Sequence, residues 1–108
     1  MDLWTGLACL IPDPSYKDFK RFGDDGKGAY VNVAAWAPSE EEFGNKVKSA
    51  TADLDCILVE LEHIQLLELR IEEPDSPDEL IDMRTTAQRQ PNDIVFGDFH
   101  IWVQDDAN

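Results

Sequence analysis

The sequence predicts an α+β domain, a two-layer sandwich in which two helices cover one face of a mainly antiparallel sheet. Strand-like alternation of side chains recurs along the chain, and two segments between the alternating stretches begin with explicit helix caps. The chain has 108 residues, the size of one domain with one hydrophobic core. The order strand, helix, strand, helix, strand is that of a ferredoxin-like core.

We expect the domain to have three parts. Residues 1–28 form an N-terminal strand or arm and a loop, residues 29–104 form the α+β core, and residues 105–108 form a frayed tail. The apolar stretch LWTGLACLI does not resemble a signal peptide, because Asp2 stands where a basic region is needed and Pro12 follows at once. We therefore expect a cytoplasmic protein, with Cys9 and Cys56 reduced.

Two weaker patterns lie between the N-terminal stretch and the core. The spacing of Tyr16, Phe19 and Phe22 predicts a short amphipathic helical piece. The following GDDGKG is typical of a tight turn. It is not a phosphate-binding loop, because Lys27 is followed by Gly28 and a strand rather than by Ser or Thr and a helix.

The strand at about 29–37 has two different faces. Side chains alternate along a strand, so odd positions form an ordinary apolar core face. The even positions carry two aromatic rings and an amide, which suit a buried interface or a binding surface. The odd face comprises Val31, Val33, Ala35 and Ala37, and the even face comprises Tyr30, Asn32, Ala34 and Trp36.

A helix start follows the strand. Ser39 is a favourable N-cap, and Glu42 three residues later completes a capping box. The apolar residues beyond it recur at helical spacing and predict roughly four turns of helix with one buried stripe. The stripe consists of Phe43, Val47, Ala50 and Leu54.

The run from Cys56 to Glu73 predicts a second strand. Ile57, Val59 and Leu61 share one parity, but the apolar positions change parity further along, and no turn residue separates the halves. We therefore predict one long bent strand with a bulge near residues 63–66 rather than a tight hairpin.

A second helix is predicted from Ser76 as N-cap, with Pro77 at the first helical position and Glu79 completing a capping box. QPND at 90–93 ends it. Its inward side is expected to carry Leu80, Met83, Arg84 and Ala87. The last element, IVFGDFHIWV at 94–103, predicts one strand that is apolar on both faces and therefore internal or covered.

The second face of the sheet needs a cover, and three covers are open. Two copies of the chain could stack as a homodimer that encloses a cavity, the N-terminal segment could fold back across the sheet, or another protein could bind. One parity of the last strand would extend this face. The predicted binding surface comprises Tyr30, Asn32, Trp36, Phe96 and Trp102.

Charge excludes some partners. The chain carries 23 acidic and 9 basic residues, a formal net charge of -14, and so lacks the basic footprint of a nucleic-acid binder. Anionic membrane surfaces would also repel it. A basic protein partner would be attracted, chiefly through a faster encounter.

The sequence offers little evidence of catalysis. Asp98 and His100 fall on one side of a regular last strand with Trp102 and are weak catalytic candidates. A polar pair at the rim of the sheet is the favoured interpretation, because an Asp two residues before a His is a weak signal by itself. His63 stands among Glu60 and Glu62 without the fixed spacing of metal ligands, so no metal and no cofactor is predicted.

The leading hypothesis is a non-catalytic, acidic binding or regulatory domain that acts through its sheet face. Its more specific form is an immunity-type inhibitor of a basic protein. The alternative is a small dimeric α+β-barrel enzyme or ligand-binding protein with a cavity near His100.

Overall fold

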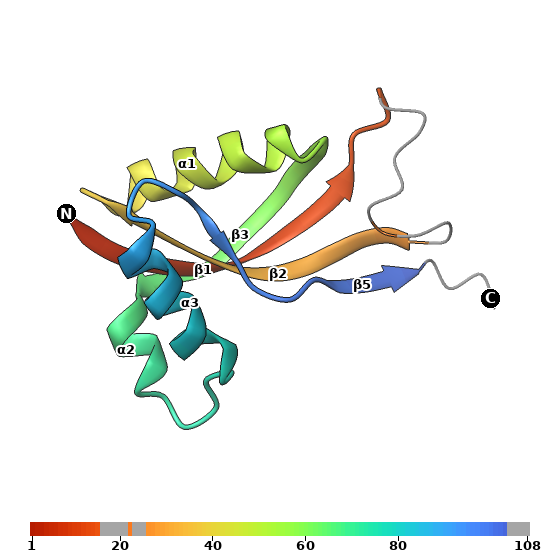
Figure 1. The fold of residues 1–108 in the computed structure, drawn as a ribbon. Coiled ribbons are helices and arrows are strands. Elements are labelled where there is room, and N and C mark those ends of the chain that lie inside the picture. The colour runs from red at the N-terminus through yellow and green to blue at the C-terminus, as the bar shows by residue number, and fades with distance from the viewer. Residues whose placement is uncertain (16–21, 23–25, 104–108) are drawn as a thin grey trace.

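The computed structural model describes residues 1–15, 22 and 26–103. In this part of the chain five strands form one sheet in the order β3-β1-β2-β4, with β5 also paired to β2 (Figure 1). Every pair of neighbouring strands is antiparallel. The strands are β1 (Asp2–Pro12), β2 (Gly26–Ala37), β3 (Cys56–Leu66), β4 (Val95–Phe96) and β5 (His100–Val103).

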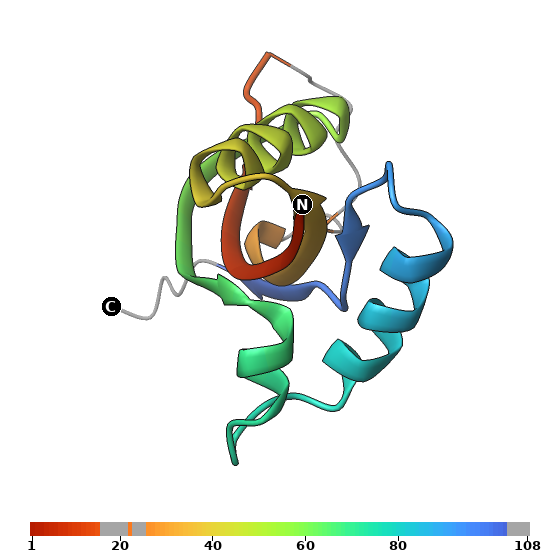
Figure 2. The same ribbon diagram turned by 90° about the vertical axis from the view of Figure 1, so that its left-hand side faces the viewer.

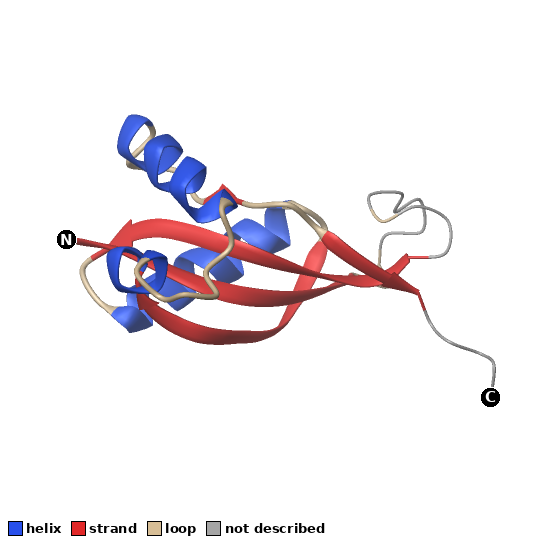
Figure 3. Cartoon of the chain, turned by 90° about the horizontal axis from the view of Figure 1, so that it is seen from below, coloured by secondary structure: helices blue, strands red, loops and turns tan. Residues whose placement is uncertain are grey.

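The predicted α+β class and antiparallel sheet are confirmed, whereas the ferredoxin-like strand order is not. Strand β1 lies in the interior, paired with β2 on one side and β3 on the other. Both of its faces carry apolar side chains, with Leu3 buried on one face and Leu10 on the other, as an interior strand requires. Residues 2–12 thus form a strand of the sheet, the first of the two forms predicted for the N-terminal segment, rather than an arm or a cover. The strands lie side by side along the length of the sheet (Figure 3).

Helices lie on both faces of the sheet, which corrects the prediction of two helices on one face. Helix α1 (Glu40–Asp53) lies on one side, and α2 (Leu67–Ile71) and α3 (Glu79–Arg89) lie on the other (Figure 2). The reason is the double-faced β2. Val31 and Val33 pack in a core with Phe43 of α1, whereas Ala34 packs with Leu80 of α3 in a second core.

Helix α1 begins where its capping signal predicts. The Ser39 hydroxyl accepts a hydrogen bond from the backbone N–H of Glu42 at 3.2 Å, which satisfies one of the unpaired donors of the first turn. Phe43, Val47 and Thr51 are buried against the sheet. The acidic first turn, Glu40 to Glu42, also complements the helix dipole.

Strand β3 contains the predicted bulge, but it ends earlier than predicted. Between Thr5 and Leu7 the register shifts by one residue, so that His63 and Ile64 of β3 lie opposite the single residue Gly6 of β1. His63 adopts a positive φ of 55°. The strand stops at Leu66, and α2 follows at once. Leu67 and Ile71 both pack into the second core. They are four residues apart, a spacing that fits one face of a strand and equally one face of a helix, so the apolar pattern did not distinguish the two.

A further irregularity reverses the predicted face at the start of β3. The register shifts again between Cys9 and Leu10. Leu58 therefore packs against the core while Ile57 and Val59 are 41% and 50% exposed. A bulge moves all following side chains to the other face, and residue alternation alone does not reveal it.

Helix α3 exists, but its predicted cap is wrong. The Ser76 hydroxyl donates to the backbone oxygen of Ile71 at 3.0 Å, so it caps the end of α2 rather than the start of α3. Helix α3 begins at Glu79, and Asp78 before it makes no side-chain cap. Leu80, Met83 and Ala87 are buried as predicted, while Arg84 is half-buried.

The C-terminal segment is broken into two short strands, not one internal strand. Gly97 to Phe99 separate β4 from β5, and both strands pair with β2 at the edge of the sheet.

Of the predicted helical piece before β2, only Phe22 is described, and its ring lies 6.1 Å from that of Phe99. Tyr16, Phe19, the first residues of GDDGKG and the predicted tail lie outside the described residues.

Candidate functional site

The second face of the sheet, which α2 and α3 share, is covered at one end and open at the other. Trp36 lies at the covered end, where its indole Nε1 donates to the backbone oxygen of Ala87 at 3.0 Å. Helix α3 of the same chain therefore covers this end of the face. Because α3 covers Trp36, this residue is not part of the predicted binding surface. The open end of the face remains without a cover from the described residues.

Asn32 lies midway along β2 and is held by α3. Its Nδ2 donates to Glu79 Oε2 at 2.7 Å, and the other oxygen of the same carboxylate accepts from the backbone N–H of Asp98 at 2.8 Å. The backbone N–H of Gly97 donates to the backbone oxygen of Asn32 at 2.8 Å. Glu79 thus joins α3, β2 and the β4–β5 loop.

The open end is built by one cross-strand row of side chains. Cys9 pairs with Glu60 of β3 on one side and with Tyr30 of β2 on the other, and Tyr30 pairs with His100 of β5. Directly paired residues point to the same face of a sheet. A carboxylate, a thiol, a phenol and an imidazole therefore lie in line across four strands.

Two aromatic rings stand at the end of this row. The rings of Tyr30 and Trp102 have centroids 5.1 Å apart at an angle of 39°. The Trp102 ring covers Gly28, where an added Cβ would lie 2.3 Å from two ring atoms, so only glycine fits there. Tyr30 is 44% exposed although it is a large ring. We define the aromatic–acidic patch as Cys9, Tyr30, Glu60, Glu62, His100 and Trp102.

Negative charge shapes the protonation of this patch. Burial raises the pKa of the Cys9 thiol, and Glu60 and Glu62 raise it further against the opposing hydrogen bond with Tyr30. The pKa of Tyr30 is raised first by Cys9 and then by the same two carboxylates. A hydrogen bond and Coulomb repulsion from Glu62 raise the pKa of Glu60. The thiol therefore stays protonated at neutral pH and is a poor nucleophile.

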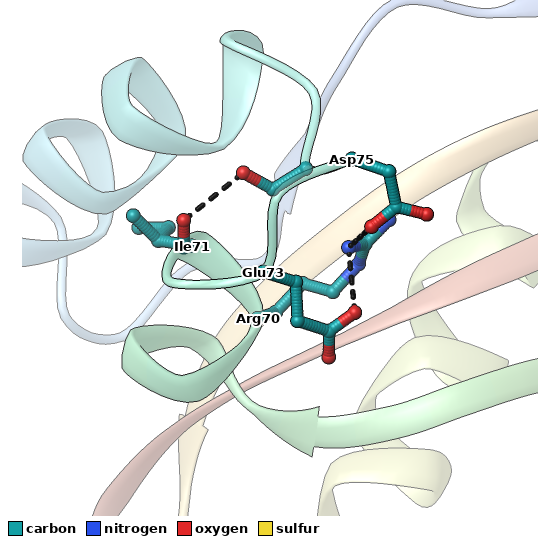
Figure 4. A network of polar contacts seen from close by, with 5 residues as sticks. Arg70, Ile71, Glu73 and Asp75 are labelled. Carbon is teal, nitrogen blue, oxygen red and sulfur yellow. Dashed lines mark hydrogen bonds and ion pairs between the residues drawn. The ribbon is translucent and has the colours of Figure 1, made fainter.

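A polar cavity of about 470 Å³ lies between the covered and open ends. It is bounded by β1, the bulge of β3, α2 and the loop after α2, and we call it the α2 pocket. Arg70 of α2 lies in it, where its Nη1 donates to Glu73 at 2.9 Å and to Asp75 at 3.1 Å (Figure 4). Its lining residues are Thr5, Gly6, Leu7, Asn32, His63, Ile64, Gln65, Arg70, Glu73 and Asp75.

The predicted site residues are only partly brought together. Tyr30 and Trp102 are in contact, but Phe96 pairs with Val33 and packs against the core on the α1 side, so the prediction that it shares their face is wrong. The interruption at Gly97 to Phe99 causes this, because it changes the parity between Phe96 and His100.

The same interruption separates the two catalytic candidates. Asp98 lies in the loop before β5, with its backbone bound to Glu79, while His100 is in the cross-strand row beside Tyr30. No hydrogen bond or ion pair joins Asp98 to His100 in the described part of the chain. His100 lines neither the α2 pocket nor a second, more open groove of about 810 Å³ between α1 and the loop before β4.

The possible metal set around His63 is dispersed. His63 lies 3.7 Å from Glu62 and is largely exposed. Glu68, the next acidic residue along the chain, turns instead to Arg84, with which it pairs at 3.0 Å. Within residues 1–15, 22 and 26–103, no three His, Cys, Asp or Glu side chains gather as metal ligands would. In the same residues, no helix has the length and apolarity needed to cross a membrane.

Three of the residues that sequence reasoning did not assign to these sites show what it can and cannot detect. Glu79 was assigned to a helix cap, Arg70 was placed in a strand, and Cys9 was treated only as a reduced thiol. Arg70 did carry a signal, since Glu73 follows it at the i+3 spacing of a helical ion pair. Cys9 carried none, because its neighbours come from β2 and β3.

Comparison with known proteins adds no assignment: no protein-family model matches the chain, and no curated protein or solved structure matches it either.

Proposed function

We propose that this chain is a non-catalytic binding domain that docks a basic protein on its aromatic–acidic patch. The single observation that supports this most is the exposed Tyr30 ring packed at an angle against Trp102, next to the Glu60 and Glu62 carboxylates. Aromatic faces attract guanidinium and ammonium groups, and the neighbouring carboxylates add ion pairs to the same cations. Such a patch suits the Arg and Lys side chains of a partner.

Charge favours a basic protein over a second copy of this chain. A symmetric dimer would place the same patch on both sides of the interface, so Glu60 and Glu62 would face their own copies. Like charges that meet at an interface cost affinity, whereas opposite charges speed association. The net charge of -14 extends the attraction for a basic partner beyond the patch itself.

The chemistry of the patch supports binding rather than catalysis. The thiol of Cys9 is held in its protonated form, and Asp98 does not orient His100. A nucleophile and base need to be within hydrogen-bond reach of each other, with the base oriented by a third group. Inhibition of a basic toxin or nuclease, the immunity-type role, is the more specific form of this proposal.

The test compares affinities for a basic protein recovered from lysate with the wild-type chain. The double variant Glu60→Gln/Glu62→Gln removes two charges from the patch. The control Glu40→Gln/Glu41→Gln removes the same number from the exposed first turn of α1, on the other face. We expect the patch variant to slow association and to weaken binding at low salt, and the control to leave most of the affinity intact.

A third variant tests the aromatic part of the patch. Trp102→Ala should weaken binding by roughly 30-fold or more if the ring is a centre of the interface. Equal affinity of the wild type and the Glu60→Gln/Glu62→Gln variant would refute the proposal. So would a stable dimer of the chain, measured by light scattering, that Trp102→Ala converts to monomer, because a second copy would then occupy the patch.

A further inference from the structure

The α2 pocket is separate from the aromatic–acidic patch and has the composition of a small-molecule site. Its volume of about 470 Å³ falls in the range of ligand pockets, roughly 300–1,000 Å³. Leu7 and Ile64 supply apolar wall, and charged and amide side chains supply the rest. A few polar groups on a partly apolar wall are what fix the orientation of a small ligand.

Arg70 keeps hydrogen-bond donors for a ligand. Both of its bonds, to Glu73 and to Asp75, use the same nitrogen, Nη1. Within the described residues, Nη2 and Nε donate to no other group. Glu73 and Asp75 hold the guanidinium in place. It remains accessible to a ligand because the side chain is 21% exposed. A carboxylate binds such a planar donor pair through two parallel hydrogen bonds.

Acceptors for an amine line the same pocket. Glu73 accepts through Oε2 and Asp75 through Oδ1, so each carboxylate retains its second oxygen (Figure 4). Asn32 donates its Nδ2 to Glu79, which leaves Oδ1 as the acceptor of this pocket-lining amide. An ammonium group has three donors and no acceptor, and these oxygens match it.

The balance of charge selects between ligand classes. One guanidinium and two carboxylates leave the pocket with a net negative charge, which opposes a simple anion. A simple cation would compete with Arg70 for Glu73 and Asp75 and would leave the donors of Arg70 unused. A ligand that carries both a carboxylate and an ammonium group satisfies the donors of Arg70 and the acceptor oxygens of the pocket at the same time.

The pocket is preformed by the backbone around it. His63 holds a positive φ of 55°, an unfavourable conformation for a residue with a side chain, at the bulge that lines the pocket. On the other side, Ser76 ties the loop after α2 to Ile71 at 3.0 Å. We propose that the α2 pocket binds a small zwitterion of the α-amino-acid type, with its carboxylate on Arg70 and its ammonium among Glu73, Asp75 and Asn32.

The experiment titrates the ¹⁵N-labelled full chain with each proteinogenic α-amino acid at about 10 mM and follows the backbone amide resonances by NMR. We expect at least one amino acid to shift the resonances of Gly6, Leu7, Gln65 and Arg70. The amine and the carboxylic acid that carry the same side chain each lack one charged group. Each should bind at least tenfold more weakly than the amino acid itself.

A matched pair of variants tests the role of Arg70. Arg70→Gln should weaken binding at least tenfold, because the carboxylate loses its charged donor. Arg84→Gln is the control, since Arg84 also pairs with a carboxylate, Glu68 at 3.0 Å, but does not line the pocket. Thermal unfolding of each variant shows whether it is folded.

Three results would overturn the inference. They are the absence of shifts with every amino acid, equal binding of the amine or the acid alone, and unchanged affinity in folded Arg70→Gln. If Arg70→Gln does not fold, the comparison of amino acid, amine and acid on the wild-type chain decides the question without it.

Discussion

Glu79 makes the most informative single test of this fold. Its carboxylate accepts one hydrogen bond from Asn32 Nδ2 at 2.7 Å and one from the backbone N–H of Asp98 at 2.8 Å. In Glu79→Gln the side chain keeps its size but replaces one acceptor oxygen with an NH₂ donor. One of the two partners then faces a donor, and the charge that strengthened both bonds is lost.

The expected cost follows from these two bonds. Hydrogen bonds to charged groups contribute about 1.5–3 kcal/mol each, and Glu79 is only half-buried, so we expect a loss of about 2 kcal/mol in the free energy of unfolding. For a domain of this size that is a decrease in Tm of roughly 8–16 °C. The variant should still fold, because small domains have about 5–15 kcal/mol of stability.

Urea denaturation followed by tryptophan fluorescence measures this change. The control is Asp82→Asn, which also removes one negative charge from the first turn of α3 but whose side chain is exposed. The two variants share the loss of a favourable helix-dipole interaction, worth about 0.3–1 kcal/mol, and differ in the hydrogen bonds. Equal losses in Glu79→Gln and Asp82→Asn would refute the assignment of Glu79 as the link between α3, β2 and the β4–β5 loop.

Three further outcomes are expected. Ser39→Ala removes the cap of α1 and should lower the free energy of unfolding by about 1 kcal/mol in urea denaturation, with no change expected in the patch. Gly28→Ala places a Cβ 2.3 Å from the Trp102 ring, so it should destabilise the fold by about 1–3 kcal/mol and change the tryptophan fluorescence of the native state. Glu62→Gln should raise Tm at pH 7, because Glu62 raises the pKa of Glu60 in the folded chain and the ionised pair is therefore unfavourable above that pKa. The gain should disappear near pH 3, where both carboxyl groups are protonated in the parent chain, and a Tm difference that is independent of pH would contradict the repulsion.

Local sequence signals determined the elements whose structure depends on near neighbours. Ser39 and Glu42 predicted the start of α1, because a cap is formed within four residues. The two faces of β2 were also predicted, because side-chain alternation follows from the backbone of a single strand. The bulge near His63 was predicted from a change of apolar parity within β3.

Long-range pairing decided the features that the sequence did not reveal. Residues 2–12 are apolar on both faces, as an interior strand is, but nothing in them identifies β2 and β3 as the neighbours. The order of strands in a sheet depends on which edges remain unpaired after folding. The apolar even face of β2 needed a cover, but the local pattern did not show that Trp36 would receive it from α3 through Ala87.

The candidate sites depend mostly on long-range pairing between strands. The row of Glu60, Cys9, Tyr30 and His100 exists only because β3, β1, β2 and β5 align in one register. Tyr30 and His100 were candidates from the sequence, but nothing local to Cys9 or Glu60 indicated that they would lie beside Tyr30. The break at Gly97 to Phe99 then turns Phe96 away from Trp102, although an unbroken strand would have kept them on one face. The sequence by itself therefore determined which segments have an apolar face and where helix α1 begins. The tertiary structure decided which of those faces is buried, because burial depends on residues that are distant in sequence and meet only in the folded chain.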